Sequence, residues 1–169
     1  ESNEGYHPNK DGRSRKYNAV YVMQNGKYAE RVQENGILPV GVQPKTLLPN
    51  YRFFDDERYF FSLLDVAMDY GKELGELLSP FLISVGDKKV PVGMELCEDL
   101  WCHDYRAKGE PINITKILIK AGAEGIVNLS ASPWTFMKNN ARDRRVKYLK
   151  EQSGAFVKYY YVNCVGVQN

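Results

Sequence analysis

The first third of the chain carries patterns typical of short strands joined by a tight turn. Residues 17–24 (YNAVYVMQ) are rich in β-branched and aromatic residues and predict a strand. The Asn-Gly pair at 25–26 is a strong hairpin signal, so we expect a second strand over 27–32. A short strand is expected over 40–43. Residues 45–59 mix proline, asparagine, aromatic and charged residues without a period, which predicts an ordered loop.

The rest of the chain alternates between helical and extended patterns. The spacing of apolar and charged residues predicts helices over 61–70, 112–121 and 139–152. Strands are predicted over 81–85, 90–96, 126–129 and 156–162. Every second residue of 90–96 is apolar, so we expect one face of that strand in the core, and Pro91 argues against central pairing at its start. Strands that alternate with helices predict an α/β layered fold.

Composition and charge narrow the classes of function. The 169 residues are 43% hydrophobic, which is enough for a folded core, and 23 basic residues nearly balance 21 acidic ones. That balance gives no electrostatic case for a nucleic acid or an anionic membrane as partner, and no apolar run is long enough to cross a bilayer. Three cysteines, an odd number without a secretory leader, favour a reduced, cytoplasmic setting.

Both ends of the chain look like cuts. The sequence begins without methionine and stops directly after an apolar run. We therefore expect residues 1–169 to be part of a single larger domain. Removing strands and helices from a layered fold uncovers sheet edges and apolar faces. We expect such a piece to form homo-oligomers or to carry exposed apolar patches.

The sharpest local feature is a cysteine at the end of the predicted strand 90–96. Cys97 is followed by Glu98 and Asp99, and a thiol at such a strand end can face a cleft. Strand alternation would put Glu95 on the same side as Cys97 if the pleat continues through both residues. The alternative is a small buried hydrophobic residue, which free cysteines often are. Because neighbouring acids raise a thiol pKa, a nucleophilic Cys97 needs a nearby cation or base.

Lys45 is the candidate cation. It lies between two prolines, in QPKTLLPNY, so its backbone is stiffer than that of an ordinary surface lysine, which is the alternative interpretation. A metal site is not expected, because the C-x4-C-H spacing of Cys97, Cys102 and His103 matches no common zinc pattern. The acidic run 55–57 is typical of a surface loop. No glycine-rich phosphate loop is present.

Three blocks of the sequence occur in an order that is typical of one protein family. They are Lys45–Tyr51 (KTLLPNY) with Phe54 and Glu57–Phe60 after it, Cys97–Trp101 (CEDLW), and Asn128–Trp134 (NLSASPW) with Lys138 and Arg142 after it. These blocks resemble the lysine, nucleophile and third motifs of the nitrilase-type glutaminase domain of glutamine-dependent NAD synthetases. They span most of residues 17–169, and their combination is far more specific than each block alone.

The resemblance implies an α-β-β-α sandwich and a Glu-Lys-Cys triad. Cys97 would attack the side-chain amide of glutamine, and Lys45 with a backbone N–H after Cys97 would stabilise the oxyanion. The ammonia would serve a separate synthetase domain, absent here, that uses ATP and Mg to convert deamido-NAD to NAD; no cofactor is expected in this chain. By the same matching, the glutamine would be held by Tyr51, Glu98 and Ser132, and also by Ser130 and Trp101.

The chain departs from the family pattern at its catalytic base. The family's glutamate lies in an early Pro-Glu motif, and neither Glu1 nor Glu4 has that context. The piece alone is therefore expected to be inactive. The second, supporting acid of such sites corresponds to Glu57 or Asp56, and Glu95 is a further candidate acid. Met137 stands where the family pattern has a glycine.

Two other functions remain open at this point. One is another nitrilase-type amidase, such as a carbamoylase or ω-amidase, without a synthetase partner. The Leu-Leu-Pro-Asn-Tyr run and the Leu-Trp pair after Asp99 argue against it. The other is a non-catalytic interaction domain with the same fold, which would explain the missing base. Such a domain gives no reason for Lys45 and Cys97 to occur together.

Overall fold

The computed structural model describes residues 14–52, 54–107, 109–133, 137–155 and 158–164. Glu1, Glu4, Trp134 and Phe156, which the sequence patterns above include, lie outside these residues, and so does the side chain of His103. No helix in the described part of the chain is long and apolar enough to cross a membrane.

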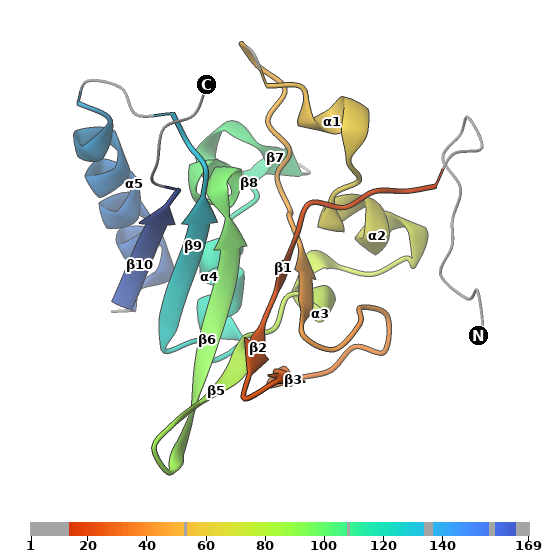
Figure 1. Cartoon of the computed structure of the whole chain (residues 1–169). Helices are drawn as coiled ribbons and strands as arrows, with labels where there is room; N and C mark the ends of the chain where they lie inside the picture. Colours follow the sequence, from red (N-terminus) through yellow and green to blue (C-terminus); the bar gives the residue numbers. More distant parts are fainter. Residues whose placement is uncertain (1–13, 53, 108, 134–136, 156–157, 165–169) are drawn as a thin grey trace.

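A four-stranded mixed sheet forms the centre of the fold (Figure 1). Its order is β10-β9-β6-β5, with β5 at Phe81–Val85, β6 at Lys88–Leu96, β9 at Gly125–Ser130 and β10 at Lys158–Asn163. β5 and β6 form an antiparallel hairpin, whereas β6, β9 and β10 run parallel. The carboxyl ends of these three strands therefore meet at one edge of the sheet.

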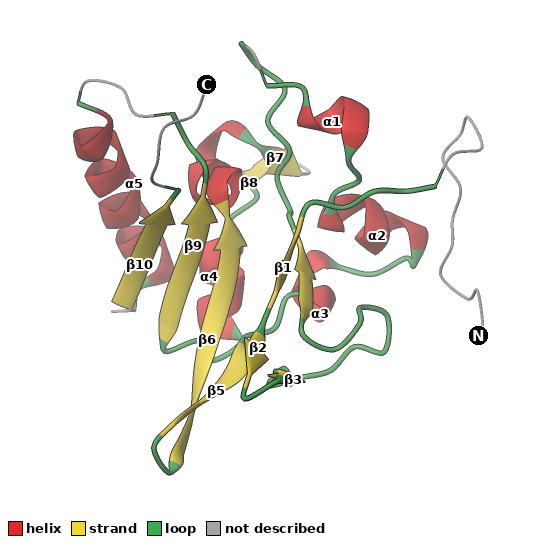
Figure 2. Cartoon of the chain, viewed as in Figure 1, coloured by secondary structure: helices red, strands yellow, loops and turns green. Residues whose placement is uncertain are grey.

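Two helices connect the parallel strands and cover one face of the sheet (Figure 2). Helix α4 spans Ile114–Lys120 and α5 spans Lys138–Ser153. The side chain of Asn113 caps α4 by accepting from the Lys116 amide at 2.9 Å, which satisfies one of the free N–H groups of the first turn. Apolar side chains on this face share one buried core; they include Leu118, Ile126 and Leu149.

The opposite face of the sheet packs against smaller strands from the first third of the chain. β1 (Ala19–Tyr21) pairs antiparallel with β4 (Val42–Pro44), and β2 (Met23–Gln24) forms a hairpin with β3 (Lys27–Tyr28). Both residues of the hairpin turn have positive φ, as the Asn-Gly pair predicts. Val20 and Val22 pack with Met94 and Leu96 of β6 in a second core.

The remaining elements are short. Helices α1 (Asp56–Tyr59), α2 (Leu63–Asp69) and α3 (Leu74–Leu77) follow β4. A 3₁₀ segment, η1 (Cys97–Asp104), follows β6, and the small ladder of β7 (Arg106–Ala107) and β8 (Glu110–Pro111) precedes α4. The two faces of the sheet are thus covered by helices and by further strands, and the α/β class predicted from the sequence is confirmed.

Most elements agree with the sequence patterns, and the differences have local causes. Pro91 lies one residue before the parallel pairing of β6 with β9 begins, so its missing N–H costs no central ladder bond, as predicted. The loop prediction for 45–59 was wrong at its end, where Asp56–Tyr59 form one helical turn. The strand predicted at 40–43 begins two residues later and ends one residue later, because β1 pairs with Val42–Pro44.

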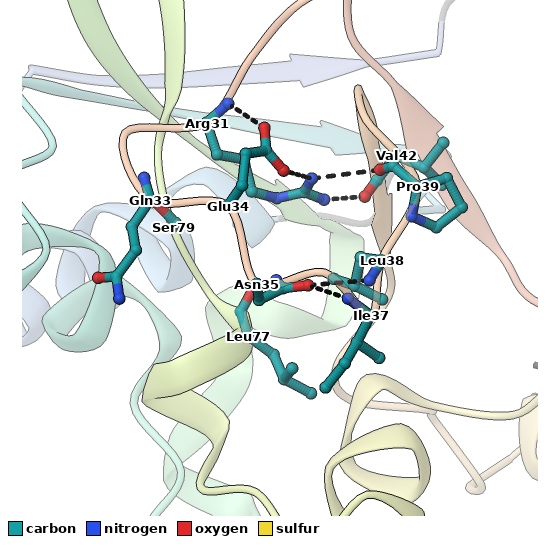
Figure 3. A network of polar contacts seen from close by, with 10 residues as sticks. All are labelled: Arg31, Gln33, Glu34, Asn35, Ile37, Leu38, Pro39, Val42, Leu77 and Ser79. Atoms are coloured by element: carbon teal, nitrogen blue, oxygen red, sulfur yellow. Dashed lines mark hydrogen bonds and ion pairs between the residues drawn. The ribbon is translucent and has the colours of Figure 1, made fainter.

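Arg31 fixes the loop that leads into β4 (Figure 3). Its guanidinium is buried over the Phe81 ring, 4.7 Å from the centroid, and donates to the carbonyls of Pro39 and Val42. Burial lowers the pKa of Arg31, and the nearby Glu34 carboxylate, which also accepts from the Arg31 amide at 2.8 Å, offsets part of that effect. The start of β4 is therefore attached to β5.

The outermost described strand leaves an apolar face open. Tyr160 and Val162 of β10 are each about half exposed. Exposed apolar faces of this kind are what self-association would cover. The homo-oligomer expected from the sequence stays a prediction.

The close packing around β6 leaves no room for a side chain at Gly93, which can be tested by substitution. A Cβ atom at this position would lie 2.6 Å from Ile126 Cδ1 and 2.9 Å from Leu118 Cδ1. We expect Gly93→Ala to lower the free energy of unfolding by about 1–3 kcal/mol, as overpacking does. Gly75→Ala is the control: a Cβ at this helical position would make only an ordinary contact, 3.9 Å from Ile117 Cγ2, so stability should rise by about 0.5–1 kcal/mol. Urea unfolding measures both, and unchanged stability of Gly93→Ala would contradict this packing.

Candidate active site

A cavity of about 920 Å³ lies where the carboxyl ends of β6 and β9 meet the segment that follows β4. Its walls come from separate parts of the chain: the segment after β4, the start of η1, the end of β9 and the first turns of α5. Eight of the candidate site residues from the sequence line it: Lys45, Tyr51, Asp56, Cys97, Glu98, Trp101, Ser130 and Ser132.

Cys97 stands at a sharp turn between β6 and η1. Its φ is +43°, in the left-handed region that residues with a Cβ rarely adopt. This turn ends the strand pleat, so Cys97 and Glu95 do not share a side as continued alternation would require. Cys97 lines the cavity, whereas Glu95 is fully buried and accepts from Thr115 and Tyr159, both at 2.5 Å.

The surroundings of the Cys97 thiol act on its pKa in opposite directions. Burial raises the pKa and is the largest effect. The charge of Lys45, a hydrogen bond with Ser130 and the charge of Lys138 lower it, while Glu98 raises it. The thiol pKa lies above its ordinary value as a result, and the nearby cations are the groups that favour the thiolate.

Lys45 is buried, and its ammonium group forms an ion pair with the acid that begins α1. The distance from Lys45 Nζ to Asp56 Oδ2 is 2.6 Å. The alternative acid, Glu57, is exposed and accepts instead from Asn50 Nδ2 at 2.8 Å. The helical turn therefore directs Asp56, and not Glu57, toward Lys45, while the identity of the supporting acid stays a prediction.

Glu98 is a buried acid on the wall of the cavity. It accepts from the phenol groups of Tyr51 at 3.1 Å and Tyr105 at 3.0 Å. Burial and the adjacent carboxylate raise the pKa of both phenols, so both stay protonated and act as donors. Tyr51 is nearly half exposed at the cavity rim, and Tyr105 holds Glu98 from the other side.

A polar network next to the cavity joins the carboxyl ends of β6 and β9. Asn128 Nδ2 donates to Glu95 Oε2 at 3.3 Å and to the carbonyl of Cys97 at 3.4 Å. The Ser130 hydroxyl donates to Asn128 Oδ1 at 2.7 Å. Burial raises the pKa of Glu95, and three hydrogen bonds oppose that rise. Glu95 thus supports the cavity floor from behind and does not line it.

Lys138 is a cavity residue to which the sequence patterns assigned no role. Its ammonium group donates to Ser132 Oγ at 2.5 Å and to the carbonyl of Pro133 at 2.9 Å. Burial, followed by the charge of Arg142, lowers the pKa of Lys138. In the sequence, only its position just after the third block indicated that Lys138 could belong to the site. Arg52 and Arg144 also line the cavity and carried no such signal.

Metal binding finds no support among the described residues, where no three acidic, cysteine or histidine side chains gather as a metal site requires. The predicted site residues instead form an acid-lined and cation-lined cavity around one thiol. Such an arrangement suits a polar substrate with charges of both signs near its reacting group.

The opposed effects on Cys97 predict how its reactivity varies with pH. Because only the thiolate reacts with iodoacetamide and the pKa is raised, the alkylation rate of Cys97 should still be rising above about pH 8.5. Lys45→Met removes a cation that lowers this pKa, so the midpoint should move to higher pH. Mass mapping of the Cys97 peptide at each pH measures the rate; a lower midpoint in Lys45→Met would contradict the electrostatic assignment.

Known proteins resemble the chain over most of its length. No family model matches it. Proteins named glutamine-dependent NAD(+) synthetase match 153 residues, 90% of the chain, at 31% identity in Aquifex aeolicus and at 34% in Xylella fastidiosa. One from Synechocystis sp. is 33% identical over 72% of the chain. The matched regions make up 20%, 22% and 19% of those relatives, so the chain spans about a fifth of their length. The chain is therefore homologous, over nine tenths of its length, to one segment of proteins named glutamine-dependent NAD(+) synthetase.

Proposed function

We propose that this chain is part of the glutaminase domain of a glutamine-dependent NAD(+) synthetase, with the nitrilase-type α-β-β-α sandwich as its complete fold. The observation that carries the proposal is the meeting of Cys97 with buried Lys45 in one cavity, from segments more than fifty residues apart. The names of the relatives support glutamine as the substrate.

In the proposed reaction, the Cys97 thiolate attacks the side-chain amide carbon of glutamine. The C–S bond forms as the carbonyl π electrons move to oxygen, and Lys45 with a backbone N–H after Cys97 stabilises the resulting oxyanion. Collapse of this intermediate expels the amide nitrogen, which leaves as ammonia after taking up a proton. Water then hydrolyses the thioester, which releases glutamate and restores the thiol.

The proton transfers require a base that accepts the thiol proton and returns it to the leaving nitrogen. Asp56 and Glu98 are the acids that line the cavity in the described part of the chain, and Asp56 is paired with Lys45 while Glu98 holds two phenols. Neither is well placed to act as that base. We propose that a glutamate from a Pro-Glu motif of the parent enzyme supplies it, and that residues 1–169 alone hydrolyse glutamine poorly.

The two charged walls of the cavity suit the amino-acid end of glutamine. Glu98 would accept from the α-ammonium group, with Tyr51 beside it. Lys138 and Ser132 would donate to the α-carboxylate. Trp101 and Ser130 would contact the side chain between that end and Cys97. The ammonia would serve a separate synthetase domain that uses ATP and Mg, with deamido-NAD as the acceptor.

Another nitrilase-type amidase is the alternative that keeps the same chemistry. The opposite charges of Glu98 and Lys138 favour an α-amino acid over a simple amide. A non-catalytic domain would need neither the buried lysine nor the left-handed turn at Cys97. Covalent labelling can distinguish both alternatives from the proposed glutaminase.

Labelling with a glutamine-mimicking electrophile tests the proposal in the parent-length enzyme. We expect modification at Cys97, protected by glutamine and lost in Lys45→Ala, because the thiolate and the oxyanion both depend on that cation. Peptide mass mapping identifies the site. Cys102, which is buried, and Cys164, which is exposed, serve as internal controls. Labelling spread over all three cysteines without protection by glutamine would leave Cys97 a structural residue.

The charged walls of the cavity can be tested separately from the chemistry. Glu98→Gln and Lys138→Met each remove a charge-assisted hydrogen bond worth about 1.5–3 kcal/mol. The glutamine concentration that gives half protection should therefore rise about ten- to hundredfold in each variant. Glu110→Gln and Lys120→Met change exposed charges outside the cavity and should leave it unchanged. Equal protection in all four variants would exclude an amino-acid site between these two walls.

A further inference from the structure

Asp99 is a buried carboxylate that joins two distant segments of backbone. It is 2% exposed, and its Oδ1 accepts from the amides of Thr46 at 3.1 Å and Leu47 at 2.8 Å. Its Oδ2 accepts from the Leu96 amide at 2.9 Å. Charged acceptors make the stronger class of hydrogen bond, and all three amides would lose this acceptor without Asp99.

The residues that Asp99 holds are the chain neighbours of the proposed catalytic pair. Thr46 follows Lys45 directly, and Leu96 directly precedes Cys97. One side chain therefore connects the segment that carries the cation to the strand end that carries the thiol. Asp99 itself does not line the cavity.

Other contacts of Lys45 do not make this connection. Its amide donates to the Asn18 carbonyl at 2.7 Å, and its carbonyl accepts from the Leu63 amide at 2.9 Å. These bonds tie the lysine to its own side of the cavity, whereas the bonds of Asp99 cross to β6. Burial raises the pKa of Asp99 to about 7, against the effect of the amides of Leu96 and Leu47, so the connection is made at an electrostatic cost.

We propose that Asp99 is a positioning residue, which sets the separation between the Lys45 ammonium group and the Cys97 sulfur by fixing the backbone on both sides. The inference rests on the proposed function only in treating these two residues as a catalytic pair. It concerns the geometry of the pair and therefore can be tested without turnover.

The test is the pH dependence of Cys97 alkylation in the chain as it stands. Cys97 faces Lys45, Lys138, Glu98 and Ser130, all of which are kept. In Asp99→Asn the amide nitrogen opposes one of the N–H groups, the two segments separate, and Lys45 acts less on the thiol. We expect a midpoint at least half a pH unit higher and alkylation at pH 8 at least threefold slower.

The sign of the change separates this mechanism from a direct charge effect. Removing a negative charge near a thiol lowers its pKa, so a direct effect of Asp99 on Cys97 would move the midpoint down. A double-mutant cycle of Asp99→Asn with Lys45→Met gives the second criterion. If Asp99 acts through Lys45, Asp99→Asn should add no further shift in the Lys45→Met background.

Asn35 provides a matched structural control. Its Oδ1 accepts from two successive amides, those of Ile37 at 3.0 Å and Leu38 at 2.8 Å, as Asp99 Oδ1 does (Figure 3). Asn35→Ala should lower stability and leave the Cys97 midpoint where it is, because this loop does not reach the cavity. A shift in Asn35→Ala as large as that in Asp99→Asn would reduce Asp99 to a purely structural role.

A second variant keeps the proposal testable if Asp99→Asn does not fold. Asp99→Glu keeps the charge, moves the carboxylate by one methylene group, and should raise the midpoint in the same direction. An unchanged or lowered midpoint in a folded variant, as judged by circular dichroism, would overturn the proposal. Unfolding of both variants would also count against it, since the carboxylate would then have no effect on the pair separable from the fold.

Discussion

The site depends on one opposition: burial of the Cys97 thiol disfavours the charge that a nucleophile needs. Desolvation is the largest influence on its pKa, and Glu98 adds to it. Lys45 and Lys138 act against both from different walls of the cavity. In the proposed reaction, this partly buried thiol with cations on two sides becomes an effective nucleophile only when a base removes its proton.

Keeping a lysine buried beside that thiol sets the next constraint. An unpaired ammonium group at this depth would be too costly, and the ion pair with Asp56 offsets part of the desolvation. The same pair also weakens the field of Lys45 at the cavity. The short helix α1 therefore matters beyond its four residues, because its first residue determines how much positive charge the cavity retains.

The sequence predicted the parts that local patterns determine. The alternating strand that leads to Cys97 and the Asn-Gly turn are read from neighbouring residues, and both are present. The sequence could not show whether Glu95 and Cys97 lie on the same side of the strand. Cys97 has a positive φ although it is not glycine, and this conformation, which ends the strand pleat, cannot be recognised from the composition. The same limit applies to Asp56, whose contact with Lys45 follows from the phase of a single helical turn.

The cavity also divides into a rigid floor and a more exposed rim. Glu95 of β6 accepts from Asn128 of β9 and from Tyr159 of β10, and Asn128 also donates to the Cys97 carbonyl. Groups proposed to recognise the amino-acid end stand higher, on segments outside the sheet, with Tyr51 nearly half exposed. Reacting atoms need tighter positioning than a charged end group does, and a floor built on paired strands supplies it. Under the proposed function, variation in the rim can therefore change which amide is bound, while the position of the thiol stays fixed by the sheet.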